Sequence, residues 1–322
     1  MTEKEPISKE ESDVPGVQAA QLPRPITLLI NTHSRKGKAQ FEAAIEALKA
    51  AGVPLSETNA VQNAQESVKL LKREIEAGAN LVIVGGGDGT LSGCAGVLAG
   101  TDVAMAVLPL GTGNTLARSL GIPLDLEGAA KTIAAGHIEA MDVGRVNGRV
   151  FLNSVSIGLS AEIAHTLDGD IKKKLGLLAW PVVGARVLWK HRARVLKISS
   201  DAKTFHVRTH QLVISNGRYI AGPVAAAPDA SVQDSALRVF TLGGAKLKDV
   251  FKMGWKLLRG QHVEDKNSRY FATQKVRVES KRGRRLMADV DGEINEHTPL
   301  ELEVWPHALR VVVPHDFDAE KV

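Results

Sequence analysis

Residues Leu81–Thr90 read LVIVGGGDGT, so that four apolar residues run directly into three glycines, an aspartate, a glycine and a threonine. An apolar run that ends in glycine is typical of a buried strand of a parallel sheet, and the small residues of Leu91–Leu98 predict a helix after it. Such a turn lets the backbone approach a phosphate, because glycines carry no Cβ and the helix N-terminus offers unpaired N–H groups. We therefore predict a polyphosphate site with one embedded carboxylate, Asp88; a tight turn without a ligand is the alternative.

Length and composition limit the class of protein. The chain has 322 residues and a formal net charge of +5, which indicates about two domains and a mildly basic surface. This charge suits an acidic ligand or an anionic membrane surface, and it is too small to predict nucleic-acid binding. Cys94 is the only cysteine, which excludes a disulfide within the chain and favours a reducing compartment. We interpret Cys94 as a small buried residue and not as a nucleophile.

The sequence predicts neither a transmembrane segment nor a secretory signal. No apolar run approaches the roughly twenty residues that cross a bilayer. Residues 1–17 mix acidic and basic side chains and contain no apolar signal core. We expect a disordered tail over residues 1–24 and a cytoplasmic location.

Residues 25–140 alternate between apolar runs and helical patterns. Strands are predicted at 25–30, 55–61, 81–84 and 103–108, with helices between them and a last helix at 115–120. This order is that of a doubly wound α/β domain, which binds ligands at the carboxyl ends of its strands. A second glycine loop, PLGTGN at Pro109–Asn114, follows such a strand. The two loops together predict a nucleotide-binding crevice.

Residues 141–305 change to short alternating runs without a fixed repeat, which predicts a mainly antiparallel β-sandwich domain. The runs lie at 141–146, 150–155, 195–199, 205–208, 211–215, 237–242, 275–279, 300–304 and 309–313. We expect residues 306–322 to return to the first domain. Two helical stretches, 171–194 and 245–260, place Lys and Arg beside Trp and Leu. Such faces suit an anionic membrane surface, and ordinary amphipathic packing is the alternative.

An ordered set of motifs resembles the diacylglycerol kinase catalytic-domain family, in the branch of bacterial soluble lipid kinases that is related to sphingosine and ceramide kinases. GGDGT at Gly86–Thr90 and PLGTGNTLA at Pro109–Ala117 carry the resemblance first. It continues in FLNSVSIG at 151–158, SNG at 215–217, PDA at 228–230 and DVDGE at 289–293. The GGDGT motif alone is shared with NAD kinases and, loosely, with phosphofructokinases, whereas the ordered set is much more specific.

The resemblance implies an ATP-dependent lipid kinase that uses Mg²⁺ and phosphorylates a hydroxyl of diacylglycerol or a similar lipid. Such an enzyme would work from the cytoplasm as a peripheral protein at the inner membrane surface. The residues that the resemblance implies for nucleotide binding are Asn31, Thr58, Gly85, Gly86, Gly87, Asp88, Gly89, Thr90, Gly111, Thr112 and Asn114.

The resemblance also implies roles for carboxylates. It implies Asp88 beside Mg²⁺ and Asp291, at a tight Asp-Gly turn, as the general base that takes the proton of the lipid hydroxyl. For a structural Mg²⁺ site it implies the carboxylate of Asp234 and the backbone carbonyls of Ser231 and Ala236. The alternatives are a plain hairpin turn at Asp291 and a surface-loop aspartate at Asp234.

Two other functions stay open. An NAD kinase-like small-molecule kinase would share the GGDGT motif, but no Asn-Glu pair follows that motif where the NAD kinases place one. A non-catalytic nucleotide- or lipid-binding relative is the third possibility, because Thr115 stands where many relatives carry aspartate. In the same way Ser235 stands where relatives often carry glycine, next to the implied structural metal site.

Overall fold

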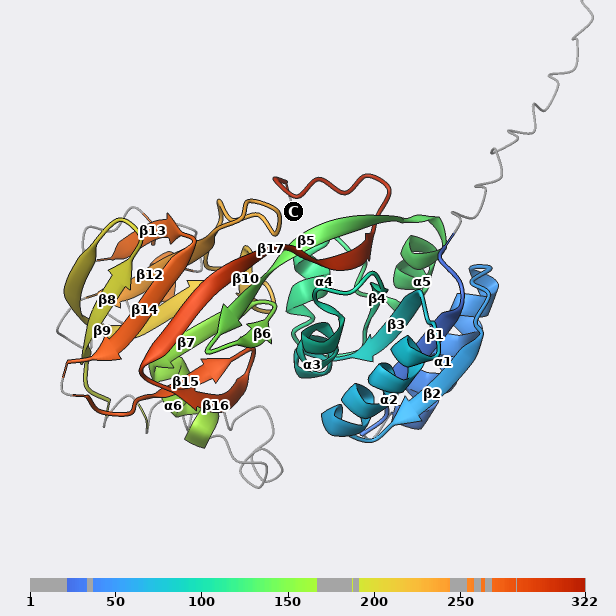
Figure 1. Ribbon diagram of the computed structural model, residues 1–322, viewed down its shortest axis with the longest axis horizontal. Coiled ribbons are helices and arrows are strands. Elements are labelled where there is room, and N and C mark those ends of the chain that lie inside the picture. The colour runs from blue at the N-terminus through green and yellow to red at the C-terminus, as the bar shows by residue number, and fades with distance from the viewer. Residues whose placement is uncertain are drawn as a thin grey trace, which may run out of the picture.

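The computed structural model describes residues 22–33, 37–166, 187, 191–243, 254–257, 262–263, 268–281 and 283–321. An α/β half and an almost entirely β half lie side by side, and two long strands run between them (Figure 1). These strands are β5 (His137–Val146) and β17 (Leu300–Val313). Most of the tail expected over residues 1–24 lies outside the described residues.

The first half is a parallel sheet covered by helices, as expected for a doubly wound domain. Its strands are β1 (Ile26–Asn31), β2 (Glu57–Val61), β3 (Leu81–Gly86) and β4 (Ala104–Pro109), and its helices are α1 (Gly37–Ala50), α2 (Ala64–Glu76), α3 (Asp88–Leu98), α4 (Thr115–Ser119) and α5 (Leu126–Ala135). The strands follow the order β2-β1-β3-β4 and are all parallel. β3 and β4 are buried along their whole length, because α1 packs with α5 and α2 packs with α3 over the sheet.

The second half is mainly antiparallel β-structure, as the alternating runs predict. Its elements are β6 (Arg149–Phe151), β7 (Ser154–Gly158), α6 (Leu159–Thr166), β8 (Arg194–Ser200), β9 (Thr204–Ser215), β10 (Tyr219–Ala221), β11 (Val224–Ala225), β12 (Leu237–Gly243), β13 (Arg269–Thr273), β14 (Lys275–Ser280), β15 (Met287–Val290) and β16 (Glu293–His297). The strands follow the path β16-β15-β7-β9-β8-β14-β17, and β12 adds to β9. Alternate residues such as Leu196, Ile198, Leu212 and Ile214 point into one apolar core.

β17 joins the two halves into one continuous sheet, because its ends pair with different partners. Near its start Leu302 pairs with Val276 of β14 in antiparallel register. Near its end Val311 pairs with Met105 of β4 in parallel register. β5 runs antiparallel to β17 beside both halves. The predicted domain limits at residues 140 and 305 therefore fall inside continuous strands.

Some elements differ from the predicted ones. No helix is predicted from the sequence at the positions of α5 and α6. The separate runs 205–208 and 211–215 form the single strand β9, and the runs 300–304 and 309–313 form β17. β17 breaks the alternation because the pairing shifts between Trp305 and Leu309, where His307 has a φ of +50°. The basic stretches 171–194 and 245–260 lie largely outside the described residues.

Candidate functional site

The two glycine loops lie against each other at the carboxyl ends of β3 and β4. Gly86 pairs with Pro109, and the Leu110 N–H donates to the Gly86 carbonyl over 3.1 Å. A Cβ on Gly111 would lie only 2.6 Å from Cα of Gly87, so the approach of the two loops requires glycine. Gly87 also precedes α3, whose first N–H groups lack helical partners. The two loops thus bring their backbones together at the carboxyl ends of β3 and β4, where the sequence predicts a nucleotide site.

Asn31 reaches this site from β1. Its side-chain amide donates to the hydroxyl of Thr90 over 3.0 Å, which joins the end of β1 to the first turn of α3. Thr58 is placed differently. It lies on the edge strand β2, level with Leu28, with an exposed side chain, and the β2 residue level with Asn31 is Val61. The structure therefore brings Asn31 to the glycine loops and leaves Thr58 three residues short of them.

Asn114 shapes the second glycine loop from inside. It adopts a left-handed conformation with a φ of +48°, and its buried side chain accepts from the Gly111 N–H over 2.9 Å and donates to the Gly111 carbonyl over 3.0 Å. Thr112, by contrast, is exposed at the tip of the loop. Asn114 therefore braces the loop, while Thr112 presents its side chain to the outside.

Asp88 connects the two loops through its carboxylate. Oδ1 accepts hydrogen bonds from the backbone N–H of Thr115 over 2.7 Å and of Leu116 over 3.4 Å, at the start of α4. Oδ2 accepts from the Thr115 hydroxyl over 3.2 Å. That hydroxyl in turn accepts from the Gly222 N–H of the β half over 3.1 Å. Thr115 is therefore a direct link from Asp88 to the second half, and this role could not be read from the sequence.

Asp291 sits in the turn of the β15–β16 hairpin, at the point where the hairpin meets α3. Val290 pairs with Glu293, which leaves a two-residue turn with a φ of +50° at Asp291 and +90° at Gly292. Both values are those that an Asp-Gly hairpin turn favours. The expected tight turn forms, and its aspartate also joins the two halves.

The Asp291 carboxylate accepts four hydrogen bonds. Oδ1 accepts from the backbone N–H of Asn153 over 2.8 Å and of Ser154 over 2.9 Å. Oδ2 accepts from the N–H of Leu152 over 2.7 Å and from the Ser92 hydroxyl of α3 over 2.7 Å. Burial raises the pKa of this carboxyl above its ordinary value, and the four hydrogen bonds act against that rise.

Glu293 is a site residue that the sequence analysis does not single out. Its Oε2 pairs with Arg149 over 3.0 Å and accepts from the Asn295 amide over 3.1 Å. Its Oε1 lies 3.5 Å from the place where a Cβ on Gly89 would stand, so this carboxylate lies against the glycine motif. Within the described residues, Oε1 accepts no hydrogen bond. The Asp-Gly-Glu sequence is the signal that could have found it, since it puts two carboxylates beside one tight turn.

The Asp234 carboxylate, implied as a ligand of a structural metal, is paired with an arginine. Asp234 accepts from the N–H groups of Ser231 and Ala236, each over 3.1 Å, and its Oδ2 lies 2.7 Å from a guanidinium nitrogen of Arg238. Ser235 has a φ of +55°, which is the left-handed region where glycine is favoured. Among the described residues, no three His, Cys, Asp or Glu side chains lie where they could hold a metal ion. This donor set does not fit a cation, because an arginine already neutralises the carboxylate.

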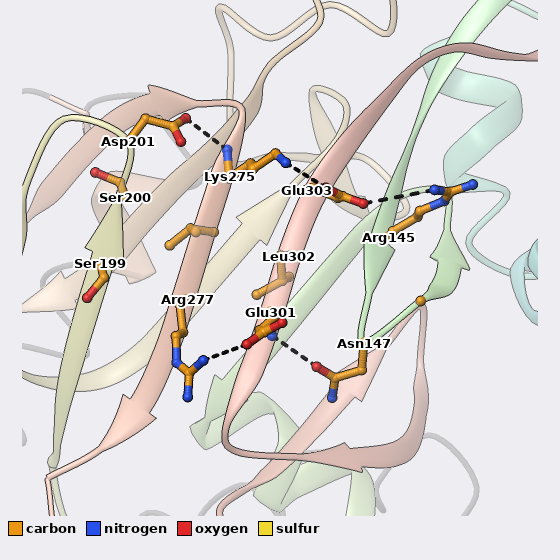
Figure 2. Close-up of a pocket in the computed structure, with 12 residues that line it drawn as sticks. Arg145, Asn147, Ser199, Ser200, Asp201, Lys275, Arg277, Glu301, Leu302 and Glu303 are labelled. Atoms are coloured by element: carbon orange, nitrogen blue, oxygen red, sulfur yellow. Dashed lines mark hydrogen bonds and ion pairs between the residues drawn. The ribbon is translucent and has the colours of Figure 1, made fainter.

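A polar cavity of about 460 Å³ lies elsewhere, between β5, β8, β14 and β17 (Figure 2). Its cations and carboxylates pair with one another: Lys275 lies 3.2 Å from Glu303, and Arg277 lies 2.5 Å from Glu301. Arg145 stacks 3.4 Å above the Trp305 ring and lies 3.9 Å from Glu303. Because these charges neutralise each other across the strands, we place the functional site at the glycine loops and not here.

The two stretches predicted to face a membrane lie mostly outside the described residues. Of the stretches 171–194 and 245–260, the structure describes residues 187, 191–194 and 254–257. Trp255 is 60 % exposed. In the part of the chain that the structure describes, no helix combines the length and the apolar character needed to cross a membrane.

Comparisons with known proteins agree with this architecture. Residues 25–146 match the family described as diacylglycerol kinase catalytic domain, and residues 153–313 match the YegS C-terminal NAD kinase beta sandwich-like domain. The chain is 30 % identical over 240 residues to a diacylglycerol kinase of Bacillus subtilis. The aligned region covers 74 % of this chain and 78 % of that protein. It is 31 % identical over 292 residues to a Pseudomonas aeruginosa protein named "Probable lipid kinase YegS-like". This aligned region covers 89 % of this chain and 94 % of that protein.

A solved structure shows the same fold. The crystal structure of a diacylglycerol kinase from Bacillus anthracis str. Sterne superposes with a TM-score of 0.72 at 24 % identity and covers 89 % of this chain and 96 % of that one.

Proposed function

The chain belongs to the diacylglycerol kinase catalytic-domain family, and from this premise we propose that it is an ATP-dependent kinase of a lipid hydroxyl, with diacylglycerol or a similar lipid as acceptor. One observation supports the proposal most directly. The hairpin that carries Asp291 and Glu293 lies against the glycine motif, through the Ser92–Asp291 hydrogen bond of 2.7 Å and the approach of Glu293 to Gly89. Phosphoryl transfer needs a site that binds the phosphates next to a carboxylate that can act as a base on the acceptor hydroxyl.

We propose that the ATP phosphates lie along the backbone of Gly85–Thr90 and Gly111–Asn114. The support is the partly exposed glycines at positions 87, 89, 111 and 113 and the positive end of α3, which favours anions. Asp88 is the residue that would hold Mg²⁺, because its Oδ2 accepts only the Thr115 hydrogen bond among the described residues. Magnesium bound with ATP neutralises charge on the phosphate oxygens.

We propose different roles for the two hairpin carboxylates. The family resemblance implies Asp291 as the general base, but its two oxygens already accept four hydrogen bonds, which fill the acceptor positions of a carboxylate. Glu293 keeps Oε1 available beside Gly89. Glu293 therefore takes the proton of the acceptor hydroxyl, and Asp291 holds the hairpin in place against α3.

We also propose that the enzyme acts on the membrane surface as a peripheral protein from the cytoplasmic side. The basic, Trp-containing stretches 171–194 and 245–260 and the exposed Trp255 support this contact. Sedimentation with vesicles that contain phosphatidylglycerol tests it. Binding that weakens with salt is expected, and equal binding to neutral vesicles in high salt would contradict it.

The activity is tested with purified protein, Mg²⁺, γ-labelled ATP and a total lipid extract, followed by identification of the labelled organic-phase product. We expect label on a lipid and none on NAD supplied in parallel. Glu293→Gln should lower turnover by roughly 10²–10⁴-fold, the range typical of a general base. Glu296→Gln on the same strand is the matched control, because Glu296 contacts Asn147 over 2.9 Å and not the glycine motif. Label on NAD and not on lipid would overturn the proposal.

A further inference from the structure

Arg238 closes the loop that precedes β12. Its side chain is 10 % exposed, and one guanidinium nitrogen lies 2.7 Å from Oδ2 of Asp234. The same nitrogen donates to the Asp229 carbonyl over 3.1 Å, and Nε donates to the Asp229 carboxylate over 3.3 Å. A single guanidinium thus binds two carboxylates and one carbonyl, three oxygens of the kind that a divalent cation would gather.

The remaining contacts of these carboxylates leave little room for a metal. Oδ2 of Asp234 already accepts from the Ser231 N–H and from Arg238, and Oδ1 accepts from the Ala236 N–H, so few acceptor positions of this carboxylate are left. The Tyr270 hydroxyl donates to Oδ1 of Asp229. A divalent ion beside Oδ2 of Asp234 would also stand next to a guanidinium, and two cations at that separation repel.

We propose that Arg238 takes the place of a structural metal ion in this chain, so that the loop from Asp229 to Arg238 is held closed without a divalent cation. The guanidinium supplies the positive charge and the directed donors, and the backbone N–H groups complete the shell of Asp234. The Arg238 side chain is only 10 % exposed, whereas the side chains of Asp234 and Asp229 are 24 % and 60 % exposed. Loss of the guanidinium therefore removes its hydrogen bonds to charged groups and leaves two carboxylates that water screens in part.

The closed loop also contacts β5, one of the two strands that form the joint between the halves. The Ser235 N–H, inside the loop, donates to Oδ2 of Asp142 over 2.6 Å. Oδ1 of the same buried carboxylate accepts from the His307 N–H over 2.8 Å. Asp142 belongs to β5 and His307 to β17, the two strands that run between the halves. Arg238 therefore acts at a distance from the glycine loops, on the stability of the joint.

The first test uses the full wild-type chain without nucleotide or lipid. Thermal unfolding is followed in EDTA, in millimolar MgCl2 and in millimolar CaCl2, and the metal content of the purified protein is measured. We expect the same Tm in all three solutions and no bound divalent ion. A Tm that rises by several degrees with Mg²⁺ or Ca²⁺ in the wild type, and not in Asp234→Asn, would overturn the proposal.

The second test removes the guanidinium. Arg238→Met should lower the Tm in EDTA by about 3 °C or more, because it removes hydrogen bonds to charged groups. Millimolar Mg²⁺ or Ca²⁺ should restore part of the loss, because two carboxylates are now unpaired. The double variant Arg238→Met/Asp234→Asn should show no restoration. Arg277→Met, which removes an exposed cation 2.5 Å from Glu301, is the matched control and should shift the Tm by less than about 2 °C.

A wild-type Tm for Arg238→Met, with no response to either ion, would contradict the proposal. If Arg238→Met yields no folded protein, the loss of folding agrees with an essential internal cation, and the wild-type series in EDTA and in the two salts then decides the outcome. None of these measurements depends on turnover, so their result is separate from the test of the kinase activity.

Discussion

The hydroxyl of Ser92 donates a hydrogen bond of 2.7 Å to Oδ2 of Asp291, although the two residues are 199 positions apart in the chain. Ser92 lies in the helix that follows the glycine motif, and Asp291 lies in a hairpin of the β half. The contact therefore joins the phosphate cradle to the hairpin that carries Glu293. The proposed mechanism depends on this junction, because neither half alone contains both the cradle and the carboxylates.

Ser92→Ala should destabilise the protein by about 1.5–3 kcal/mol, since Ser92 is buried and its hydrogen bond goes to a charged group. Urea unfolding measures the change. Thr273→Val, which removes a similar hydroxyl contact of 3.1 Å to Asp201 at an exposed site, should change the free energy of unfolding by less than about 0.5 kcal/mol. Equal decreases in the free energy of unfolding for the two variants would show that the Ser92–Asp291 hydrogen bond stabilises the protein no more than an exposed contact does.

Thr115→Val should weaken Mg·ATP binding, because it removes the hydroxyl that donates to Asp88 and accepts from Gly222. We expect an increase in the Kd for Mg·ATP of about tenfold or more, the value of one hydrogen bond to a charged group. Thr115→Ser keeps the hydroxyl and should bind as the wild type does. Calorimetric titration of the two variants checks this, and identical affinities would refute a role for the hydroxyl.

Cys94 should resist alkylation in the folded protein. It is fully buried in α3, and this burial raises the pKa of its thiol to about 12. Only the thiolate reacts rapidly, so iodoacetamide at pH 8 should leave the native chain unmodified and should label it completely in guanidinium. Mass spectrometry distinguishes these outcomes. Rapid labelling of the native chain would mean that α3 opens readily, which the buried core around it does not predict.

Acid should destabilise the protein through Glu162. Burial alone would raise the pKa of this carboxyl, but His191 at 2.8 Å and Arg194 at 2.7 Å outweigh it and hold the pKa below 4.5. A pKa lowered by folding gives stability that is present above the unfolded value of about 4.5 and is lost as the pH falls through the folded value.

Glu162→Gln should therefore flatten the fall in the free energy of unfolding below pH 4.5. The exposed Glu42→Gln is the control and should leave the curve unchanged. Unfolding curves in urea at several acidic pH values provide the measurement. A wild-type slope in Glu162→Gln would exclude this ion pair as a source of the acid sensitivity.

The arrangement of the first half follows from its sequence because local rules decide it. The unbroken apolar runs of Leu81–Val84 and Val103–Leu108 require strands covered on both faces, and the glycines after them mark the loops. Helix α5 is not predicted because most of its buried positions are alanines, namely Ala129, Ala130 and Ala134, which give a weaker apolar pattern than the larger side chains of the predicted helices. Its packing against α1 supports it in the folded chain. The two pieces of β9 appear separate because the buried polar residues Thr209 and His210 interrupt the apolar alternation. Those of β17 appear separate because the strand is bulged between Trp305 and Leu309.

The sequence predicts only part of the candidate site. The glycine loops and the Asp-Gly turn carry local signals. Three other features form only when the chain folds. They are the four hydrogen bonds of Asp291, the approach of Glu293 to Gly89 and the ion pair of Asp234 with Arg238. The first two contacts join residues far apart in the chain, and the third depends on how the loop folds back. No spacing rule predicts the Ser92–Asp291 hydrogen bond or the approach of Glu293 to Gly89, because both depend on how β17 and β5 place one half against the other.

The role of Glu293 as the base of a lipid kinase is tested by the transfer of labelled phosphate from ATP to lipid. The wild type, Glu293→Gln and Glu296→Gln are compared, and the Kd for Mg·ATP is measured on the same samples. We expect labelled lipid with the wild type and with Glu296→Gln, and a loss of roughly 10²–10⁴-fold with Glu293→Gln at an unchanged Kd. Full lipid phosphorylation by Glu293→Gln, or no labelled lipid with the wild type, would contradict it.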